Sequence, residues 1–363
     1  PWFMPDKAIA ALAFTVAAYC LLPHVAVLFA ALTSDVETLR HLAGSVLDDY
    51  ASNTALLVLI VGLGTFMIGT GAAWLVTMTT FPARRLLEIA LVIPLAFPAY
   101  VLAYAYTHIL DHPGIVQSTL RDLTGWGPRD YWFPDIRSLG GAVFVMSSVL
   151  FPYVYLTARA SFLAQSANVL EASRTLGCSP WLSFWKVGLP LARPAIAAGT
   201  ALVMMECLND IGAVEHFGVN TLTITVYDTW LERGSLGGAA QIACAMLIAV
   251  IFLFALERWS RRQQQFYQLS GKENKLPTTR LTGWKAAFAY IACLLPFLFG
   301  FGVPGLFLID ASIDHAADAL QGAFWTNAFN SFMLASFAAA IAMFLGLLMV
   351  FTRRLRNSSM MNA

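Results

Sequence analysis

Residues 171–190 read EASRTLGCSPWLSFWKVGLP, a polar stretch between two long apolar runs. Gly177 is placed to end a first short helix in the left-handed backbone conformation, which glycine adopts at little cost. Ser179 and Pro180 follow at once, and serine as N-cap with proline at the first helical position is a typical helix start. The stretch therefore predicts two short helices joined by a tight turn.

The limits of this helix pair follow from the residues around it. Ser166 or Asn168 is suited to cap the first helix, because a short polar side chain can accept a hydrogen bond from a free backbone N–H. Pro190 and Pro194 cannot donate a backbone hydrogen bond within a helix. We expect these two prolines to end the second helix and begin the next apolar segment.

The composition of the whole chain is that of a membrane protein. Hydrophobic residues make up 58% of the 363 residues and charged residues 12%, whereas about a quarter of the residues of a soluble domain are charged. Apolar runs long enough to cross about 30 Å of hydrocarbon as helices predict an all-α polytopic bundle with about eight spans. The expected spans are residues 8–32, 54–79, 86–109, 139–160, 194–214, 238–257, 285–309 and 329–351.

The basic residues predict how these spans are oriented. If the first span runs outward, 17 of the 22 lysine and arginine residues lie on one side and five on the other. Lysine and arginine are retained on the cytoplasmic side, so residues 166–190 are predicted to be a cytoplasmic loop. The outer loops are rich in acidic residues, which could contact a soluble protein but are also what remains when basic residues are retained inside.

This loop resembles a motif of known importers. In the EAA loop, E-A-A-x3-G-x9-I-x-L-P, the matching positions here are Glu171, Ala172, Ser173, Gly177, Val187, Leu189 and Pro190. The loop is typical of the inner-membrane permease subunits of binding-protein-dependent ABC importers. The resemblance implies the MetI-like helical fold, a bacterial inner-membrane location, and a coupling loop at 166–190 on which ABC ATPase subunits dock. The alternative is an amphipathic connector lying on the membrane lipid.

The same resemblance implies further partners and a route for energy. A periplasmic solute-binding protein delivers the solute in such systems, and the permease itself needs no cofactor and binds no nucleic acid. The sequence contains no G-x4-G-K-[ST] phosphate-binding loop, so we expect a partner subunit to hydrolyse ATP. The chain is accordingly predicted to be a transport subunit and not an enzyme.

A weak internal repeat predicts the domain organisation. A shift of 277 positions places Asn53-Thr54 on Asn330-Ser331 and Gly69 on Gly346. We expect a first permease half with six spans at 1–257, a cytoplasmic linker at 258–284, and the start of a second half with two spans at 285–363. The same shift would put a second coupling loop near position 448, so we expect either a fragment of two fused halves, truncated at both ends, or a second permease half supplied by a different polypeptide.

Residues 204–243 resemble the corresponding part of the iron(III) permeases, which makes iron(III) the expected solute. Glu206 and Asp210 are four residues apart and share a helix face. Ionisable groups at membrane depth are costly and mark candidate translocation paths. A path for a cation and a structural pairing with a basic side chain or a helix end from the missing half remain equally open. Permeases for thiamine, phosphonate, polyamine or sulfate, and an ion-coupled secondary transporter using these carboxylates, also remain open.

One candidate metal site accompanies these hypotheses, although we expect no metal. His108 and His112 are spaced as i and i+4 on a helix, with Asp111 between them, and Glu215-His216 occurs later in the chain. Such groups could bind a transition metal, and a membrane-embedded enzyme is the corresponding alternative function. Solvated polar groups at a membrane surface explain the same residues.

Three further patterns concern the membrane surfaces and the helices. The ten tryptophans fall near the expected span ends or in loops, and we interpret them as an aromatic belt at the membrane surfaces. Four glycines at positions 62, 64, 69 and 71 are expected to let a neighbouring helix approach closely. Pro94, Pro98 and Pro152 are expected to reduce the regularity of their helices.

Overall fold

The computed structural model describes residues 6–34, 40, 44, 47–165, 169, 172–173, 175–262, 278–319 and 323–355. The chain forms two compact units. One unit contains Pro1–Ser34 and Ile309–Ala363, and the other contains Asp35–Leu308. Three positions singled out from the sequence, Ser166, Asn168 and Glu171, fall outside the described residues.

The smaller unit is a pair of long apolar helices. Helix α1 (Asp6–Thr33) packs against α16 (Ala323–Leu355). Both are long and apolar enough to cross a membrane, and almost none of their apolar surface is buried within the chain. Such surface is stable in contact with lipid or with another protein, which agrees with the predicted membrane location.

The larger unit carries the predicted loop and most of the core. Its elements are α3 (Leu47–Met78), β1 (Thr79–Thr80), α4 (Arg84–Ala90), the 3-10 turn η1 (Ile93–Ala96), α5 (Ala99–Leu110), α6 (Ile115–Thr124), α7 (Leu139–Leu163), α9 (Pro180–Ser183), the π-helical segment η2 (Phe184–Gly188), α10 (Leu189–Asn209), α11 (Gly212–His216), α12 (Leu222–Leu231), α13 (Leu236–Arg262), β2 (Thr279–Arg280), α14 (Trp284–Phe297), a second π-helical segment η3 (Leu298–Gly302) and α15 (Val303–Ala319), whose last turns lie in the smaller unit.

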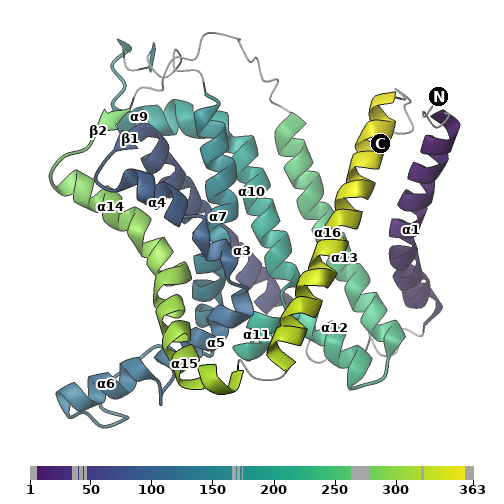
Figure 1. Ribbon diagram of the computed structural model, residues 1–363, viewed down its shortest axis with the longest axis horizontal. Coiled ribbons are helices and arrows are strands. Elements are labelled where there is room, and N and C mark those ends of the chain that lie inside the picture. The colour runs from purple at the N-terminus through teal and green to yellow at the C-terminus, as the bar shows by residue number, and fades with distance from the viewer. Residues whose placement is uncertain are drawn as a thin grey trace. The chain divides into compact units, whose positions relative to one another are not determined.

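Helices α3, α7 and α10 form the centre of this larger unit (Figure 1). Helices α3 and α7 approach each other closely at Gly69. A Cβ atom at this position would lie 2.8 Å from the backbone oxygen of Phe151 and 2.8 Å from the backbone nitrogen of Tyr155. Gly62 and Gly64 similarly face Met204 and Ser147. The sequence prediction of close helix packing is confirmed for these three glycines.

Gly71 differs from the other three glycines of α3. A Cβ atom there would meet nothing within 4 Å. The prediction that it permits a close helix approach is therefore wrong, because this position faces away from α7 and α10. The same observation makes Gly71 a useful control position for the substitutions considered below.

Within the described residues, seven helices are long and apolar enough to span a membrane, and an eighth span results if one bent pair is counted. The bent pair is 84–96 and 99–124, with an angle of 95° between its parts. The span expected at 86–109 is therefore bent, and the predicted loss of helix regularity at Pro94 and Pro98 is confirmed. Phe97 between the parts is extended, at φ −98° and ψ 129°, because the ring of Pro98 disfavours a helical conformation in the preceding residue.

The helix that begins at Pro180 continues to Asn209. Our expectation that Pro190 and Pro194 end one helix and begin another is therefore wrong. The π-helical segment at 184–188 precedes Pro190. The N–H of Leu189 bonds there to the carbonyl of Phe184, five residues earlier, whereas in an α-helix the bond spans four residues. The wider turn accommodates a proline that lacks a backbone N–H.

The same arrangement occurs later in the chain. The second π-helical segment ends at Gly302, and Pro304 follows two residues later, just as Pro190 follows Gly188. In both places the sequence is glycine, an aliphatic residue and proline. A wide turn before proline thus keeps two long apolar helices continuous where sequence rules predict an end.

Contacts between helix ends agree with the predicted sides of the membrane. At the expected outer side, the amide of Asn53 donates to the carbonyl of Asn220. At the expected inner side, β1 pairs in parallel with β2, with Thr79 opposite Thr279 and Thr80 opposite Arg280. The end of α3 is therefore joined to the segment that leads into α14.

Candidate functional site

The first half of the predicted loop ends in the expected left-handed turn. Gly177 has φ +85°, the N–H of Cys178 bonds to the carbonyl of Ser173 at 3.0 Å, and the N–H of Leu176 bonds to the carbonyl of Ala172 at 3.1 Å. A bond across five residues that encloses a left-handed glycine is the Schellman arrangement. The predicted glycine stop is confirmed.

The second half begins as predicted. The Ser179 hydroxyl accepts a hydrogen bond from the N–H of Leu182 at 3.2 Å, and Pro180 occupies the first helical position. The buried hydroxyls of Ser173 and Ser183 lie 2.8 Å apart, so they link the two helical parts across the turn. We refer to residues 172–190 as the elbow.

The elbow is packed against the helix core through one tryptophan. Trp74 of α3 is 9% exposed, and its ring centroid lies 4.8 Å from that of Phe184 and 5.3 Å from that of Phe162. A Cβ atom on Gly188 would lie 2.6 Å from the ring of Trp74. The side-chain amide of Gln165 donates to the carbonyl of Gly188 at 2.9 Å. We refer to these five residues as the joint.

The joint corrects one sequence interpretation. Trp74 was assigned with the other tryptophans to an aromatic belt, but its ring is enclosed by aromatic side chains of α7 and the elbow. It therefore connects the loop to the core. No local signal predicts this contact, because Trp74 and Phe184 are far apart in the sequence and spacing alone does not reveal a partner.

The outer surface of the elbow is apolar. Leu176 is 85% exposed, Trp181 67% and Trp185 50%. The two tryptophan rings are in edge contact, with centroids 5.7 Å apart. Large apolar side chains exposed together on a soluble face of a protein mark an interaction surface, so the elbow has both an internal attachment and an external face.

The two carboxylates predicted for the translocation path have different surroundings. Asp210 follows the last residue of α10, and its Oδ1 accepts a hydrogen bond from the N–H of Ala213 at 2.8 Å. It therefore caps α11, which is a structural role within the same half of the chain. Glu206 lies one turn earlier on α10 and is exposed in the chain taken alone.

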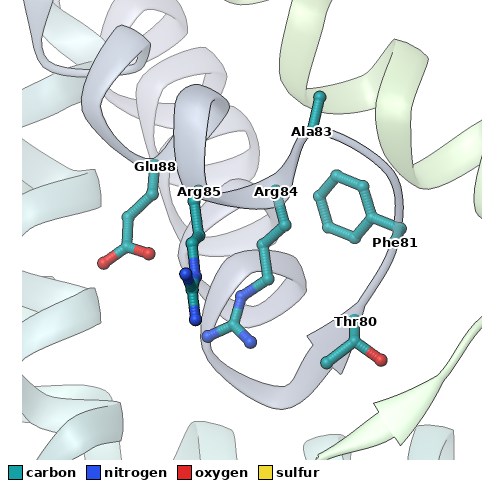
Figure 2. Close-up of a pocket in the computed structure, with 6 residues that line it drawn as sticks. All are labelled: Thr80, Phe81, Ala83, Arg84, Arg85 and Glu88. Atoms are coloured by element: carbon teal, nitrogen blue, oxygen red, sulfur yellow. The ribbon is translucent and has the colours of Figure 1, made fainter.

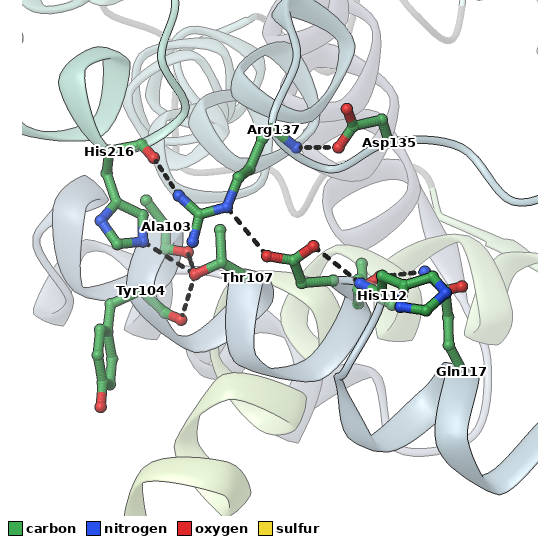
Figure 3. A network of polar contacts seen from close by, with 10 residues as sticks. Ala103, Tyr104, Thr107, His112, Gln117, Asp135, Arg137 and His216 are labelled. Carbon is green, nitrogen blue, oxygen red and sulfur yellow. Dashed lines mark hydrogen bonds and ion pairs between the residues drawn. The ribbon is translucent and has the colours of Figure 1, made fainter. Parts of the chain in front are cut away.

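A polar network lies at the C-terminal end of α5, which is expected to be at the outer side (Figure 3). Thr107 Oγ1 and His216 Nε2 are 2.8 Å apart. Arg137 Nε donates to Asp111 Oδ2 at 2.9 Å, and Arg137 Nη1 donates to the carbonyl of His216 at 3.2 Å. Burial, the charge of Arg137 and the neighbouring His108 lower the pKa of His216. The network holds α11 against α5.

The geometry argues against the metal-site hypothesis. Helix α5 ends at Leu110, and Asp111 is extended at ψ 165°, so His108 and His112 do not share a helix face as the i and i+4 spacing suggested. Asp111 is bound to Arg137 and to the N–H of His112. In the described part of the chain, no three histidine, cysteine, aspartate or glutamate side chains converge as a metal site would require.

A hollow of about 390 Å³ lies between α5 and α11. It is lined by Tyr100, Val101, Tyr104, Gly212 and His216. Tyr100 is 57% exposed and Tyr104 46%, so both present polar hydroxyls and aromatic faces to open space. Sequence reasoning missed these tyrosines, which were part of an apolar run without a distinguishing motif.

The described chain is thus a bundle of membrane-length apolar helices whose elbow is joined to the core by the joint. The family model described as "Binding-protein-dependent transport system inner membrane component" matches residues 65–264. The chain belongs to this family of inner-membrane permease subunits of ABC importers. The match contains the elbow, the joint and both predicted path carboxylates.

Characterised relatives have different solutes. The chain is 26% identical over 308 residues to the "Fe(3+)-transport system permease protein FbpB 2" of Haemophilus influenzae, with 82% of this chain and 55% of the relative covered. It is 28% identical over 196 residues to the "Molybdenum transport system permease protein ModB" of Escherichia coli, covering 52% of this chain and 82% of the relative. The chain thus spans about half the length of the Fe(3+) permease.

Solved structures support the fold. The chain resembles a subunit of "a bacterial ABC transporter involved in the import of the acidic polysaccharide alginate", with a TM-score of 0.58, 14% identity, and coverage of 72% of this chain and 97% of that one. This similarity confirms the predicted all-α permease architecture.

Proposed function

We propose that the chain is the permease part of an ABC importer that carries iron(III) into the cell. The observation that carries this proposal is the elbow, an EAA-type helix pair with an exposed apolar face and a packed attachment to the core. An ABC ATPase docks on residues 171–190, a periplasmic solute-binding protein delivers the solute at the other side, and lipid surrounds the spans.

The joint supplies a physical route for coupling. Closure of the ATPase subunits displaces the elbow, and the contacts of Phe184 and Gly188 with Trp74 transmit that displacement to α3. Close-packed interiors transmit strain because they have little free volume. Glu171, Ala172, Ser173, Gly177, Val187, Leu189 and Pro190 are the proposed coupling residues.

The length of the chain that is similar to an Fe(3+) permease favours iron(III) as the solute. The similarity to the Fe(3+) permease covers 82% of this chain, whereas that to the molybdenum permease covers 52%. A match that long extends beyond the proposed first half at 1–257 and supports the proposed linker at 258–284 and the second half beginning at 285. Molybdate and phosphonates are the competing solutes, because relatives with these names also match.

We place the path along α10, α11 and α5. Glu206 is the proposed charged contact for the solute, since its carboxylate is exposed whereas that of Asp210 caps α11. The hydroxyls of Tyr100 and Tyr104 offer further polar contacts beside the hollow. An ion-coupled transporter would use both carboxylates, and the capping bond of Asp210 does not favour that alternative.

Uptake of labelled solutes tests the proposal. Cells that carry the complete transport system are compared with cells lacking this chain, using ferric iron, molybdate and 2-aminoethylphosphonate in turn. We expect loss of ferric iron uptake alone. Loss of molybdate or phosphonate uptake would keep the permease role and overturn the proposed solute, whereas unchanged uptake of ferric iron after ATP depletion would overturn the ABC mechanism.

A further inference from the structure

A tight turn joins the inner end of α3 to α4. The N–H of Arg84 bonds to the carbonyl of Phe81 at 3.3 Å, with Pro82 and Ala83 between them. Ala83 has φ +57° and ψ 12°, and among the described residues it is the one non-glycine residue with a positive φ. Proline followed by a left-handed residue is the pattern of a type II turn, which normally has glycine at that third position.

This turn places two arginines at the edge of a cavity of about 590 Å³. The cavity is lined by Thr80, Phe81, Ala83, Arg84, Arg85 and Glu88. Figure 2 shows the guanidinium groups of Arg84 and Arg85 extending to the same side of α4, with the carboxylate of Glu88 nearby. Strained backbone conformations cluster at ligand-binding sites, and this strained turn carries two charged side chains to the edge of one cavity.

The charges around this cavity do not balance. Glu88 forms an ion pair with Arg159 of α7. In the described part of the chain the other ion pair joins Arg137 and Asp111, so neither Arg84 nor Arg85 is paired with a described carboxylate. The Nε atom of Arg84 is buried and has no hydrogen-bond partner. The lining therefore contains two guanidinium groups without a described carboxylate partner, while its one carboxylate, that of Glu88, is already paired with Arg159, which leaves an excess of positive charge.

The position of the cavity indicates which anion it suits. It lies at the predicted cytoplasmic end of α3, where the phosphate groups of the inner leaflet are found and where anionic lipids attract basic residues. Arginine presents several N–H donors in a planar fork that fits phosphate oxygens. Thr80 lines the cavity and belongs to β1, the short strand that pairs with β2.

We propose that Arg84 and Arg85 form a binding site for a phosphate group, supplied either by the headgroup of an anionic phospholipid or by inorganic phosphate. The site is separate from the elbow and is independent of the solute that the importer carries. Phosphate oxygens accept hydrogen bonds from both guanidinium groups, and the carboxylate of Glu88 does not compete for them because it is paired with Arg159.

The test compares two double variants of the chain, purified with its partner subunits in detergent. R84Q/R85Q removes two positive charges from the cavity. R193Q/R258Q removes two positive charges from exposed helix positions that the topology also places at or near the cytoplasmic side. The number of retained phospholipids is counted by native mass spectrometry with phosphatidylglycerol or phosphatidylcholine, and thermal unfolding is measured with added inorganic phosphate.

We expect R84Q/R85Q to retain phosphatidylglycerol at least tenfold more weakly than the unmodified complex, and the control pair to bind within twofold of it. Loss of the thermal stabilisation by phosphate in R84Q/R85Q, without a change in lipid retention, would support the site with inorganic phosphate as its source. Equal lipid retention and equal phosphate stabilisation in all three proteins would overturn the proposal, as would an equal loss in the control pair. If R84Q/R85Q does not assemble, R85Q alone is decisive, because Arg85 is exposed and its replacement leaves the core unchanged.

Discussion

Replacing Gly188 by alanine tests whether the joint transmits movement of the elbow. The added Cβ would lie 2.6 Å from Trp74 Cζ3 and 3.1 Å from Trp74 Cη2. Carbon atoms in favourable contact are about 3.5–4.0 Å apart, so a displacement of about 1 Å is required. Trp74 cannot turn away freely because Phe162 and Phe184 enclose its ring.

The displacement must therefore be absorbed by the elbow or by α3. Overpacking of this kind typically costs about 1–3 kcal/mol, and about 1.4 kcal/mol corresponds to a tenfold change in an equilibrium constant. We expect the G188A protein to insert into membranes but to lose about 1–3 kcal/mol of unfolding free energy. ATP-driven uptake should fall by about tenfold, because the altered contact no longer moves α3 with the elbow.

The assay is solute uptake per ATP hydrolysed in proteoliposomes that contain the complete transporter. G71A is the matched control, since it makes the same change in α3 where a Cβ meets nothing within 4 Å. The double variant W74F/G188A should recover part of the uptake, because the smaller ring leaves room for the methyl group. Normal coupling in G188A, or no recovery in the double variant, would refute the reasoning.

Five other substitutions, at four positions, give distinct outcomes. Gly177→Val should abolish ATP-driven uptake while membrane insertion persists. Gly177→Asn should retain uptake, because asparagine tolerates the left-handed conformation that valine does not. Equal uptake by the two variants would contradict this prediction. Ala83→Gly should raise the unfolding free energy by about 1 kcal/mol, because glycine adopts the left-handed conformation without strain. Denaturant titration measures this free energy, and a decrease would contradict the prediction. Asp210→Ala should lower the unfolding free energy by about 1 kcal/mol through loss of the α11 cap. Glu206→Gln should slow uptake without changing stability. An unaltered uptake rate would remove Glu206 from the path.

The parts of the elbow that the sequence predicts are those controlled by neighbouring residues. Gly177 ends a helix and Ser179 begins one because the groups that decide both lie within five positions along the chain. Span number and location follow from apolar length, for the same local reason. Backbone rules of this range need no knowledge of tertiary contacts.

The features that sequence reasoning missed depend on distant contacts or on wider turns. The burial of Trp74 depends on Phe184, more than a hundred residues away. The helix through Pro190 survives because a π turn replaces the break that proline rules predict. Asp210 appeared equally suited to a path or to a structural role until its bond to the N–H of Ala213 identified it as a cap. Tertiary context decided each of these cases.

Cysteine crosslinking from the elbow tests the central claim most directly. Leu176 is 85% exposed on the elbow, and Trp132 is 86% exposed in a loop predicted to face the opposite side. In membranes containing the complete transporter, L176C should crosslink to an ATP-hydrolysing subunit and be protected from reagents added outside the cell, whereas W132C should react from outside and capture no such subunit. A Leu176 position that is labelled from outside, or that never captures the ATPase, would contradict the account.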